Sequence, residues 1–252
     1  MLKAAIMKTP IYPIARSAYQ AVFNRGAAAH KARMGAFYSQ FFQPNSRVFD
    51  VGANQGEYSE VFAAEGARVL AIEPNTAFST RLHALARTAD IQPVFVAIGE
   101  EPGEATLNVC SVPGFSTLVD RHVDWIEESP DYKDVRWTHT LTVPVTTLDL
   151  LAKEYGEPEF VKIDVEGFEI NVLRGMSFRP RYLSFEFGAR RKGPSLVCLE
   201  HMGAQNYRFR PIVGREYRFA TPEWMSLDEA RAWLDGYSVD QGEYGDMFCH
   251  RI

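Results

Sequence analysis

Length, composition and charge limit what this chain can be. Its 252 residues, 46% hydrophobic and 23% charged, fit one folded α/β domain with short extensions. Cys110, Cys198 and Cys249 are widely spaced, which argues against a zinc site and predicts reduced, buried thiols. The N-terminus lacks the apolar core of a signal peptide, and no apolar run approaches the roughly 18 residues of a membrane span. We therefore expect a cytoplasmic protein without a transmembrane segment.

Basic and acidic residues are unevenly distributed. Residues 1–49 contain seven Lys or Arg and no acid, whereas residues 50–252 contain 20 basic and 32 acidic side chains. The basic segment can dock on the acidic body, on an anionic membrane surface or on an acidic substrate, and the sequence leaves these alternatives open. A body this acidic repels a phosphate backbone, so we expect no nucleic-acid partner.

The first 45 residues are predicted to form a basic helical extension. Alanine is frequent over 14–42, and apolar residues recur there at roughly helical spacing. Gly26 is expected to divide this stretch into two helices. The sequence Pro44-Asn45-Ser46 then links the extension to a single domain over 46–252.

Short apolar runs alternate with helical patterns after residue 46. The predicted strands are 47–51, 68–72, 93–98, 160–165 and 182–187. The predicted helices are 58–65, 76–87, 147–155 and 168–173. This alternation predicts an α/β fold with a mostly parallel, doubly wound, Rossmann-like sheet.

Two regions depart from this alternation. Residues 99–145 are predicted to be an insertion of two extended segments with a loop between them. Residues 206–211 and 246–252 are predicted to close the sheet as an antiparallel hairpin at its edge.

A glycine-bearing turn follows the first strand, as in the nucleotide cradles of doubly wound folds. Gly52 and Gly56 permit positive φ angles, and Asn54 between them also tolerates a left-handed conformation. The carboxylate of Asp50 would repel a pyrophosphate by roughly 1–4 kcal/mol at 4 Å. It suits a ligand with an ammonium group. S-Adenosylmethionine carries an ammonium and a sulfonium and no phosphate, so the charge pattern favours it.

A second acid ends the next predicted strand. Glu73 follows Asp50 by 23 residues, and an acid at this position can accept hydrogen bonds from both ribose hydroxyls of an adenosine. Pro74 then stiffens the turn. Asp50 and Glu73 could also be ordinary residues that close a strand or lie on the surface. Because two acids end successive strands, this interpretation is the weaker one.

Six segments of the chain resemble the FkbM-type methyltransferases. They are DVGANQG (50–56), AIEPN (71–75), AIGEEPG (97–103), TTLDLL (146–151), FVKIDVEGFEINVLRG (160–175) and YLSFEF (182–187). The resemblance covers about residues 47–190. It implies a class I methyltransferase fold and usually O-methylation of a hydroxyl on a sugar, glycan, glycolipid or natural product. The implied S-adenosylmethionine site comprises Asp50, Gly52, Ala53, Asn54, Gly56, Glu73, Pro74, Ala97, Ile98 and Asp164.

The segment around Asp164 supplies the candidate catalytic residues. Lys162 and Asp164 share one face of a predicted strand whose carboxyl end should lie beside the methyl donor. Asp164 or Glu166 can serve as the base toward a substrate hydroxyl, and Lys162 more readily neutralises these carboxylates than reacts. Asp164 and Glu186 are also candidate ligands of Mg²⁺, which prefers oxygen donors. The alternative role for Glu166, together with Glu169, is to cap the next helix.

Other polar residues are weaker candidates. The segment 114–118, Gly-Phe-Ser-Thr-Leu, resembles a family segment near the cofactor, although a polar turn explains it equally well. His122 and His139 are expected to be structural or surface residues.

The sequence leaves two competing functions open. One is an NAD-dependent sugar oxidoreductase or epimerase, which would need a clear Gly-x-Gly-x-x-Gly turn. The other is a non-catalytic module that binds the cofactor.

Overall fold

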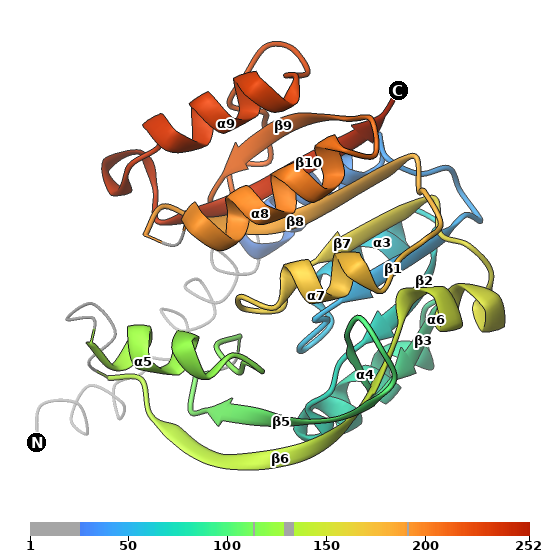
Figure 1. The fold of residues 1–252 in the computed structure, drawn as a ribbon. Helices are drawn as coiled ribbons and strands as arrows, with labels where there is room; N and C mark the ends of the chain where they lie inside the picture. The colour runs from blue at the N-terminus through green and yellow to red at the C-terminus, as the bar shows by residue number, and fades with distance from the viewer. Residues whose placement is uncertain (1–25, 113, 129–133, 191) are drawn as a thin grey trace, which may run out of the picture.

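A seven-stranded sheet forms the centre of the molecule in the computed structural model, which describes residues 26–112, 114–128, 134–190 and 192–252 (Figure 1). Its strands are β1 (Arg47–Val51), β2 (Arg68–Ile72), β3 (Ile91–Val94), β7 (Phe160–Ile163), β8 (Tyr182–Gly188), β9 (Tyr207–Val213) and β10 (Tyr244–Arg251). The order is β3-β2-β1-β7-β8-β10-β9, and neighbours run parallel except β10, which is antiparallel to β8 and β9. The predicted doubly wound sheet with an antiparallel edge is confirmed.

Helices cover both faces of this sheet. One layer contains α6 (Leu148–Tyr155), α7 (Glu169–Arg174), α8 (Lys192–Gly203) and α9 (Leu227–Gly236). The other contains the helix of residues 26–38, α3 (Glu57–Ala64) and α4 (Ser79–Ala86). Successive strand side chains point to opposite layers, so Val161 and Ile163 join the first core and Phe160 joins the second.

On the face covered by the helix of residues 26–38, the strands change from apolar to ionic toward the carboxyl ends of the parallel strands. Cross-strand pairing gives Val48, Phe160, Tyr182 and His250 in the first row, Asp50, Lys162, Ser184 and Phe248 in the second, and Glu186 and Asp246 in the third. Asp164 lies just beyond the end of β7. The aromatic and aliphatic side chains of these rows belong to the hydrophobic core, and the core stops where the charged side chains begin.

An aromatic cluster attaches the N-terminal segment to this face. The ring of Phe41 stacks on Phe160 at 5.5 Å and on Phe248 at 4.7 Å between centroids. Lys31 forms an ion pair with Glu60 of α3 at 2.8 Å, which is one contact of the basic extension with the body. Gly26 is the first described residue of its helix, and the predicted helix before it lies outside the described residues. The proposed boundary at residue 45 stays a prediction.

The inserted region forms a second, three-stranded sheet of order β4-β6-β5 (Figure 1). Its strands are β4 (Ala97–Ile98), β5 (Gly103–Cys110) and β6 (Trp137–Thr146), and β5 and β6 are the two extended segments expected. The predicted strand 93–98 was wrong as one unit. The chain pairs with β2 only as far as Val94, and Ala97 then pairs with Val145 of the second sheet. An apolar run alone does not reveal such a change of sheet.

Three helices of the described residues were not predicted from the sequence, namely α5 (Asp120–Glu128), α8 and α9. Because α9 lies between β9 and β10, the two edge strands pair as expected but are not joined as a hairpin. A capping box at Ser226 and Glu229 starts α9, and this Ser-x-x-Glu signal was present in the sequence. The three cysteines are free and buried, as predicted. Within the described residues, no helix combines the length and the apolarity needed to span a bilayer.

Phe41→Ala should lower the free energy of unfolding by roughly 3–5 kcal/mol, the usual cost of removing a buried phenylalanine ring. Phe41 is 2% exposed and contacts rings on two strands. Urea denaturation measures the change. Leu150→Ala is the control, because Leu150 is 44% exposed and should cost little. Equal effects of the two variants would show that the N-terminal segment adds no stability.

Candidate functional site

The turn after β1 brings the carboxyl ends of β1 and β7 together. Gly52, Asn54 and Gly56 have φ angles of 82°, 51° and 79°, the left-handed values expected for this turn. A Cβ on Gly52 would lie 1.8 Å from the carbonyl oxygen of Asp164, so a side chain there would force the two strand ends apart. The backbone N–H groups of Gly52 and Ala53 donate to the carbonyl of Ile72, which ties the turn to β2.

Asp50 lies beneath this turn. Its side chain is 1% exposed, and its Oδ2 accepts a hydrogen bond from Ser59 Oγ at 2.5 Å. Burial raises its pKa, against the opposing effects of Lys162 and Ser59. Asp50 is not among the residues that line the two hollows described in the following paragraphs, and its direct contact with a ligand stays a prediction. The strand turns this side chain toward α3, which the sequence pattern did not reveal.

Glu73 ends β2 and joins two loops. Its Oε2 accepts from the N–H of Asn54 at 2.8 Å, and its Oε1 accepts from the N–H of Asn75 at 2.7 Å. Burial raises the pKa of Glu73 to about 7, although both hydrogen bonds oppose the shift. The side chain is 7% exposed and lines the inner cavity, and its contact with a cofactor stays a prediction.

The inner cavity, as we call it, is a space of about 590 Å³, including open solvent, between the ends of β1, β2 and β7 and the second sheet. Seven residues of the predicted cofactor site line it: Gly52, Asn54, Glu73, Pro74, Ala97, Ile98 and Asp164. Ala53 lines the adjoining hollow, and Gly56 is the N-cap of α3, outside both. Gly114, Ser116 and Leu118 bring the second sheet's loop to the same cavity.

Sequence reasoning missed the apolar walls of the inner cavity. Phe78, Val96 and Phe168 line it together with the polar residues. Phe168 directly follows Glu166 and Gly167, and Phe78 lies shortly after Glu73. Their positions after these two turns were the only feature of the sequence that could have indicated a place in the cavity wall. Apolar and aromatic walls with a few polar groups are typical of small-molecule sites.

A larger hollow, the outer cleft, opens beside the inner cavity. It occupies about 1880 Å³, including open solvent, and is lined by parts of α3, β8, β10 and the loops around them. Asp164 and Glu166 line both spaces, so these two carboxylates stand at the junction. His122, expected to be structural, also lines the cleft, whereas His139 is exposed on β6.

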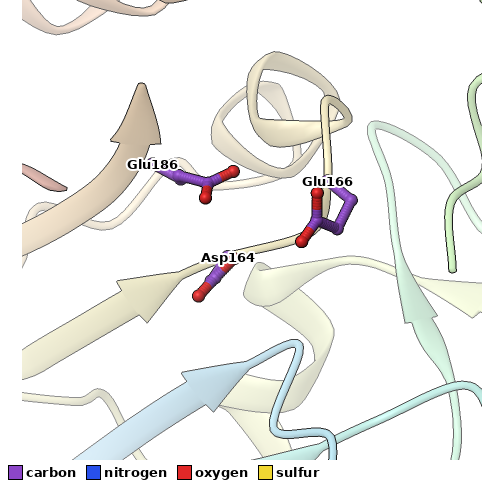
Figure 2. A group of neighbouring side chains, drawn as sticks. All are labelled: Asp164, Glu166 and Glu186. Carbon is purple, nitrogen blue, oxygen red and sulfur yellow. The ribbon is translucent and has the colours of Figure 1, made fainter. Parts of the chain in front are cut away.

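Three carboxylates meet at this junction. Asp164, Glu166 and Glu186 each offer an oxygen, and these oxygens lie within 4.8 Å of one another (Figure 2). Glu166 has a φ of 54°, a left-handed value rare for this residue type and common at functional sites. Its carboxylate lies 3.6 Å from Nε2 of the buried His122.

Glu169 bonds the backbone of the turn that precedes α7. Its Oε1 accepts from the N–H groups of Gly167 at 3.0 Å and Val165 at 3.3 Å. The hydroxyl of Thr117, in the 114–118 segment, donates to the Glu166 carbonyl at 2.8 Å. The turn is therefore held from two sides while the Glu166 carboxylate faces the two hollows.

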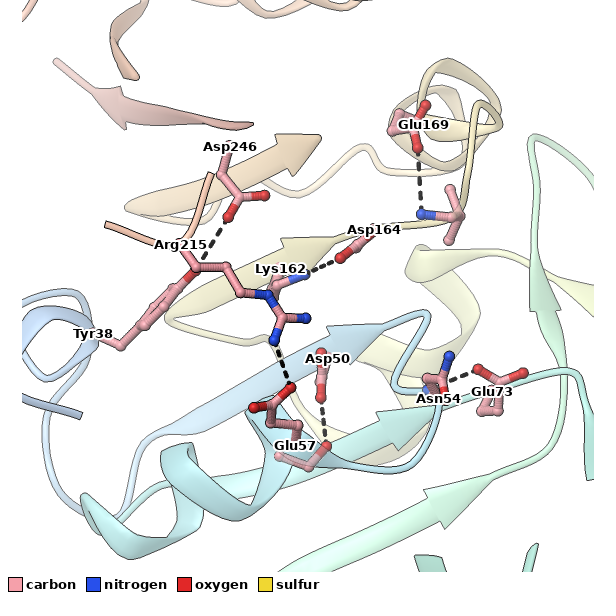
Figure 3. A network of polar contacts seen from close by, with 12 residues as sticks. Tyr38, Asp50, Asn54, Glu57, Glu73, Lys162, Asp164, Glu169, Arg215 and Asp246 are labelled. Atoms are coloured by element: carbon pink, nitrogen blue, oxygen red, sulfur yellow. Dashed lines mark hydrogen bonds and ion pairs between the residues drawn. The ribbon is translucent and has the colours of Figure 1, made fainter. Parts of the chain in front are cut away.

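Lys162 supplies the positive charge beneath these acids. The side chain is 1% exposed, and its Nζ donates to Asp164 Oδ2 at 2.7 Å (Figure 3). The Nζ also lies 4.1 Å from the ring centroid of Tyr58. Burial alone would lower the pKa of Lys162, but Asp164, Asp246 and Asp50 outweigh it and raise the pKa. The lysine therefore stays protonated and is unsuited to act as a base.

Glu73 should make stability depend on pH. Because its pKa is raised from 4.5 to about 7 in the folded chain, its contribution is complete below pH 4.5 and is lost as the pH rises through 7. A shift of this size corresponds to about 3 kcal/mol. We expect the free energy of unfolding, measured by urea denaturation, to fall more between pH 5 and 8 for the wild type than for Glu73→Gln. The variant retains Asp50 and Asp246, whose pKa values are also raised, so the difference between the two proteins reports on Glu73 alone. Parallel curves for the two proteins would contradict the raised pKa.

Matching solved structures include the precorrin-6y C5,15-methyltransferase of Geobacter metallireducens GS-15, with 10% identity, a TM-score of 0.40 and 87% of each chain covered. An rRNA methylase of Streptococcus thermophilus matches with 9% identity and a TM-score of 0.42, over 87% of this chain and 94% of that one. Cofactor-bound Rv0187 from MTB matches with 12% identity and a TM-score of 0.42, over 99% and 95%. No curated protein sequence matches significantly.

The sequence model of the methyltransferase FkbM domain matches residues 50–239, about three quarters of the chain. The match includes the glycine turn, Glu73, the three clustered carboxylates and Lys162. The NAD-dependent oxidoreductase considered from the sequence is thereby set aside. The chain belongs to the FkbM methyltransferase family, and its mostly parallel sheet is Rossmann-like.

Proposed function

We propose that this protein transfers a methyl group from S-adenosylmethionine in the inner cavity to a hydroxyl in the outer cleft. The position of Asp164 carries this proposal. Its side chain lines both spaces, so a donor in one and an acceptor in the other would meet at this carboxylate. Bringing two reactants together in line supplies much of the acceleration in such a displacement.

The chemistry of the inner cavity suits the donor. Glu73 already binds two backbone N–H groups, and each of its oxygens retains a lone pair that can accept from a ribose hydroxyl. Phe78 and Phe168 provide apolar surface for an adenine ring. The cluster of Asp164, Glu166 and Glu186 supplies negative charge for an ammonium and a sulfonium. We therefore assign the selecting charge to this cluster and to Glu73, and not to Asp50.

Calorimetric titration with S-adenosylhomocysteine tests the donor site. The unmodified chain should bind it, and Glu73→Ala should bind roughly 10–100-fold more weakly because hydrogen bonds to a charged acceptor are lost. Glu104→Ala, an exposed site on β5, serves as the matched control and should leave the affinity unchanged. Absence of binding by the unmodified chain would remove the proposed function.

Asp164 is the proposed base. In the transfer step the acceptor oxygen bonds to the methyl carbon, the carbon–sulfur bond breaks, and S-adenosylhomocysteine leaves. The hydroxyl proton passes to an Asp164 oxygen. The Lys162 ammonium donates to Oδ2 of this carboxylate and holds it at the junction of the two spaces. Glu166, 3.6 Å from the His122 ring, is the second candidate for the same step.

Asp164→Asn should lower the turnover number by about 10²–10⁴-fold, the usual contribution of a general base. Transfer of labelled methyl groups to a panel of sugars, glycolipids and hydroxylated natural products measures it, with Glu104→Gln as the control. Unchanged turnover would exclude Asp164 as the base. Absence of transfer by the unmodified chain to every acceptor, despite cofactor binding, would favour the non-catalytic binding module.

A magnesium ion is a secondary proposal for the same carboxylates. Their three oxygens lie within 4.8 Å of one another, and Mg²⁺ binds oxygen ligands. A bound metal would lower the pKa of an acceptor hydroxyl. The ammonium of Lys162 already neutralises Asp164, which weakens the case. Loss of transfer in EDTA and its recovery with MgCl₂ would support the ion, and equal rates would exclude a requirement for it.

The charge of the outer cleft supports an acceptor without phosphate groups. Among the described residues that line it, seven are acidic and four are Lys or Arg. An excess of negative charge disfavours a nucleic-acid backbone and permits a neutral sugar hydroxyl. Of the basic extension, Lys31 reaches the rim of this cleft. We keep contact of residues 1–49 with a membrane surface or an acidic substrate as a prediction.

A further inference from the structure

His122 is a buried polar residue at the edge of the proposed transfer site. It is the third residue of α5, which belongs to the insertion and not to the seven-stranded sheet. The residue is 4% exposed and lines the outer cleft. Its Nε2 lies 3.6 Å from Oε2 of Glu166, one of the two carboxylates that line both spaces. An imidazole thus faces the acid at the junction from the side of the insertion.

The start of α5 is tied to the turn that carries Glu166. The Thr117 hydroxyl donates to the carbonyl of Glu166 at 2.8 Å and accepts from the N–H of Val119 at 3.1 Å, just before the helix begins. The side-chain amide of Asn108 on β5 donates to Oδ1 of Asp120, the first residue of the helix, at 3.1 Å. These bonds fix where the helix begins relative to the three carboxylates.

Glu166 is held on its backbone and on its side chain. Its φ of 54° is left-handed, and the N–H groups of the residues on either side of it both donate to Glu169. Its carbonyl accepts from Thr117. These backbone contacts fix where the side chain begins but leave its own rotamers free. The imidazole of His122 contacts the carboxylate itself.

Charge repulsion makes such a hold on the carboxylate necessary. The oxygens of Asp164, Glu166 and Glu186 lie within 4.8 Å of one another (Figure 2). Like charges repel at this distance, so a freely rotating Glu166 side chain would turn away from the junction. An imidazole with a hydrogen on Nε2 can donate to a carboxylate and oppose that motion. The distance of 3.6 Å is longer than a hydrogen bond, and contacts of this kind commonly shorten when substrates are bound.

We propose that His122 is a positioning residue of the transfer site, which holds the Glu166 carboxylate at the junction of the two spaces. There Glu166 accepts a hydrogen bond from a second hydroxyl of the acceptor, beside the hydroxyl that gives its proton to Asp164. A hydroxyl has a single hydrogen to donate, so the two carboxylates need two donors. This role rests on the methyl transfer proposed above, whereas the contact between His122 and Glu166 does not.

Nuclear magnetic resonance of the His122 imidazole tests the contact without any ligand. Long-range ¹H–¹⁵N correlations report the surroundings of the ring nitrogens, and the His122 signals are assigned by their absence in His122→Gln. Glu166→Gln, which removes the charge and keeps the size, should shift the Nε2 signal at constant pH. Glu127→Gln, at an exposed position of α5, should leave it in place. An unchanged signal in folded Glu166→Gln would overturn the proposal.

Transfer kinetics test the effect on the acceptor. The probe is the member of the acceptor panel above that the unmodified chain methylates fastest. His122→Leu should raise the KM for this acceptor about tenfold, the usual effect of losing a hydrogen bond to a charged group, and should leave the turnover number within about threefold. His122→Gln, whose amide nitrogen can take about the place of Nε2, should recover most of the affinity. His139→Leu, at an exposed position of β6, is the matched control.

A double-mutant cycle separates positioning from a general structural role. In the Glu166→Gln background, His122→Leu should change the KM by less than about twofold. It should also keep the S-adenosylhomocysteine affinity within about twofold, because His122 is not among the described residues that line the inner cavity. An equal effect in both backgrounds, or a parallel loss of S-adenosylhomocysteine affinity, would overturn the positioning role.

Two further outcomes keep the proposal distinct from the proposed function. If His122→Leu does not fold, the imidazole signal in Glu166→Gln and the KM of His122→Gln, which should stay near that of the wild type, decide. If the unmodified chain transfers no methyl group, the proposed function fails, while the same imidazole signal still decides whether His122 contacts Glu166.

Discussion

The buried ammonium of Lys162 is the interaction on which the arrangement of this site depends. It lies in the row where the sheet face changes from aromatic to ionic, between Asp50 on β1 and Asp164 at the end of β7. Without it, several carboxylates would share a poorly solvated space, where each ionised group raises the pKa of the others. The lysine holds Asp164 by a hydrogen bond where the inner cavity and the outer cleft join. Burial raises the pKa values of Asp50 and Asp246 beneath it.

Backbone geometry then determines how closely the glycine turn after β1 approaches the segment around Asp164. A Cβ on residue 52 would collide with the carbonyl oxygen of Asp164, and glycine avoids this collision. The glycine turn after β1 and the segment around Asp164 after β7 can therefore lie directly against each other. Glu73 fastens the far side of that turn through its bond to the Asn54 N–H. In the proposed function, donor and acceptor would therefore meet at the carboxyl ends of three adjacent parallel strands, where open α/β sheets usually bind ligands.

The sequence revealed local features of this site better than distant ones. Strands β1 and β2 were predicted to the residue, because short apolar runs bounded by turn residues leave little choice. Glu73 and Asp164 were placed by the rule that parallel strands end at the same edge. The hydrogen bond of Asp50 with Ser59 could not be foreseen, because a period of two gives the face of a side chain but not what covers that face. Asp246 could not be found, since only the cross-strand register with Glu186 brings it to the site.

The account rests on one spatial claim, that the methyl donor lies in the inner cavity with its reactive end at Asp164. A crystal structure of the unmodified chain with S-adenosylhomocysteine tests it most directly. We expect the ribose hydroxyls within hydrogen-bond distance of the Glu73 carboxylate and the sulfur directed at the junction beside Asp164. A ligand bound elsewhere, or one whose sulfur points away from the outer cleft, would contradict the account.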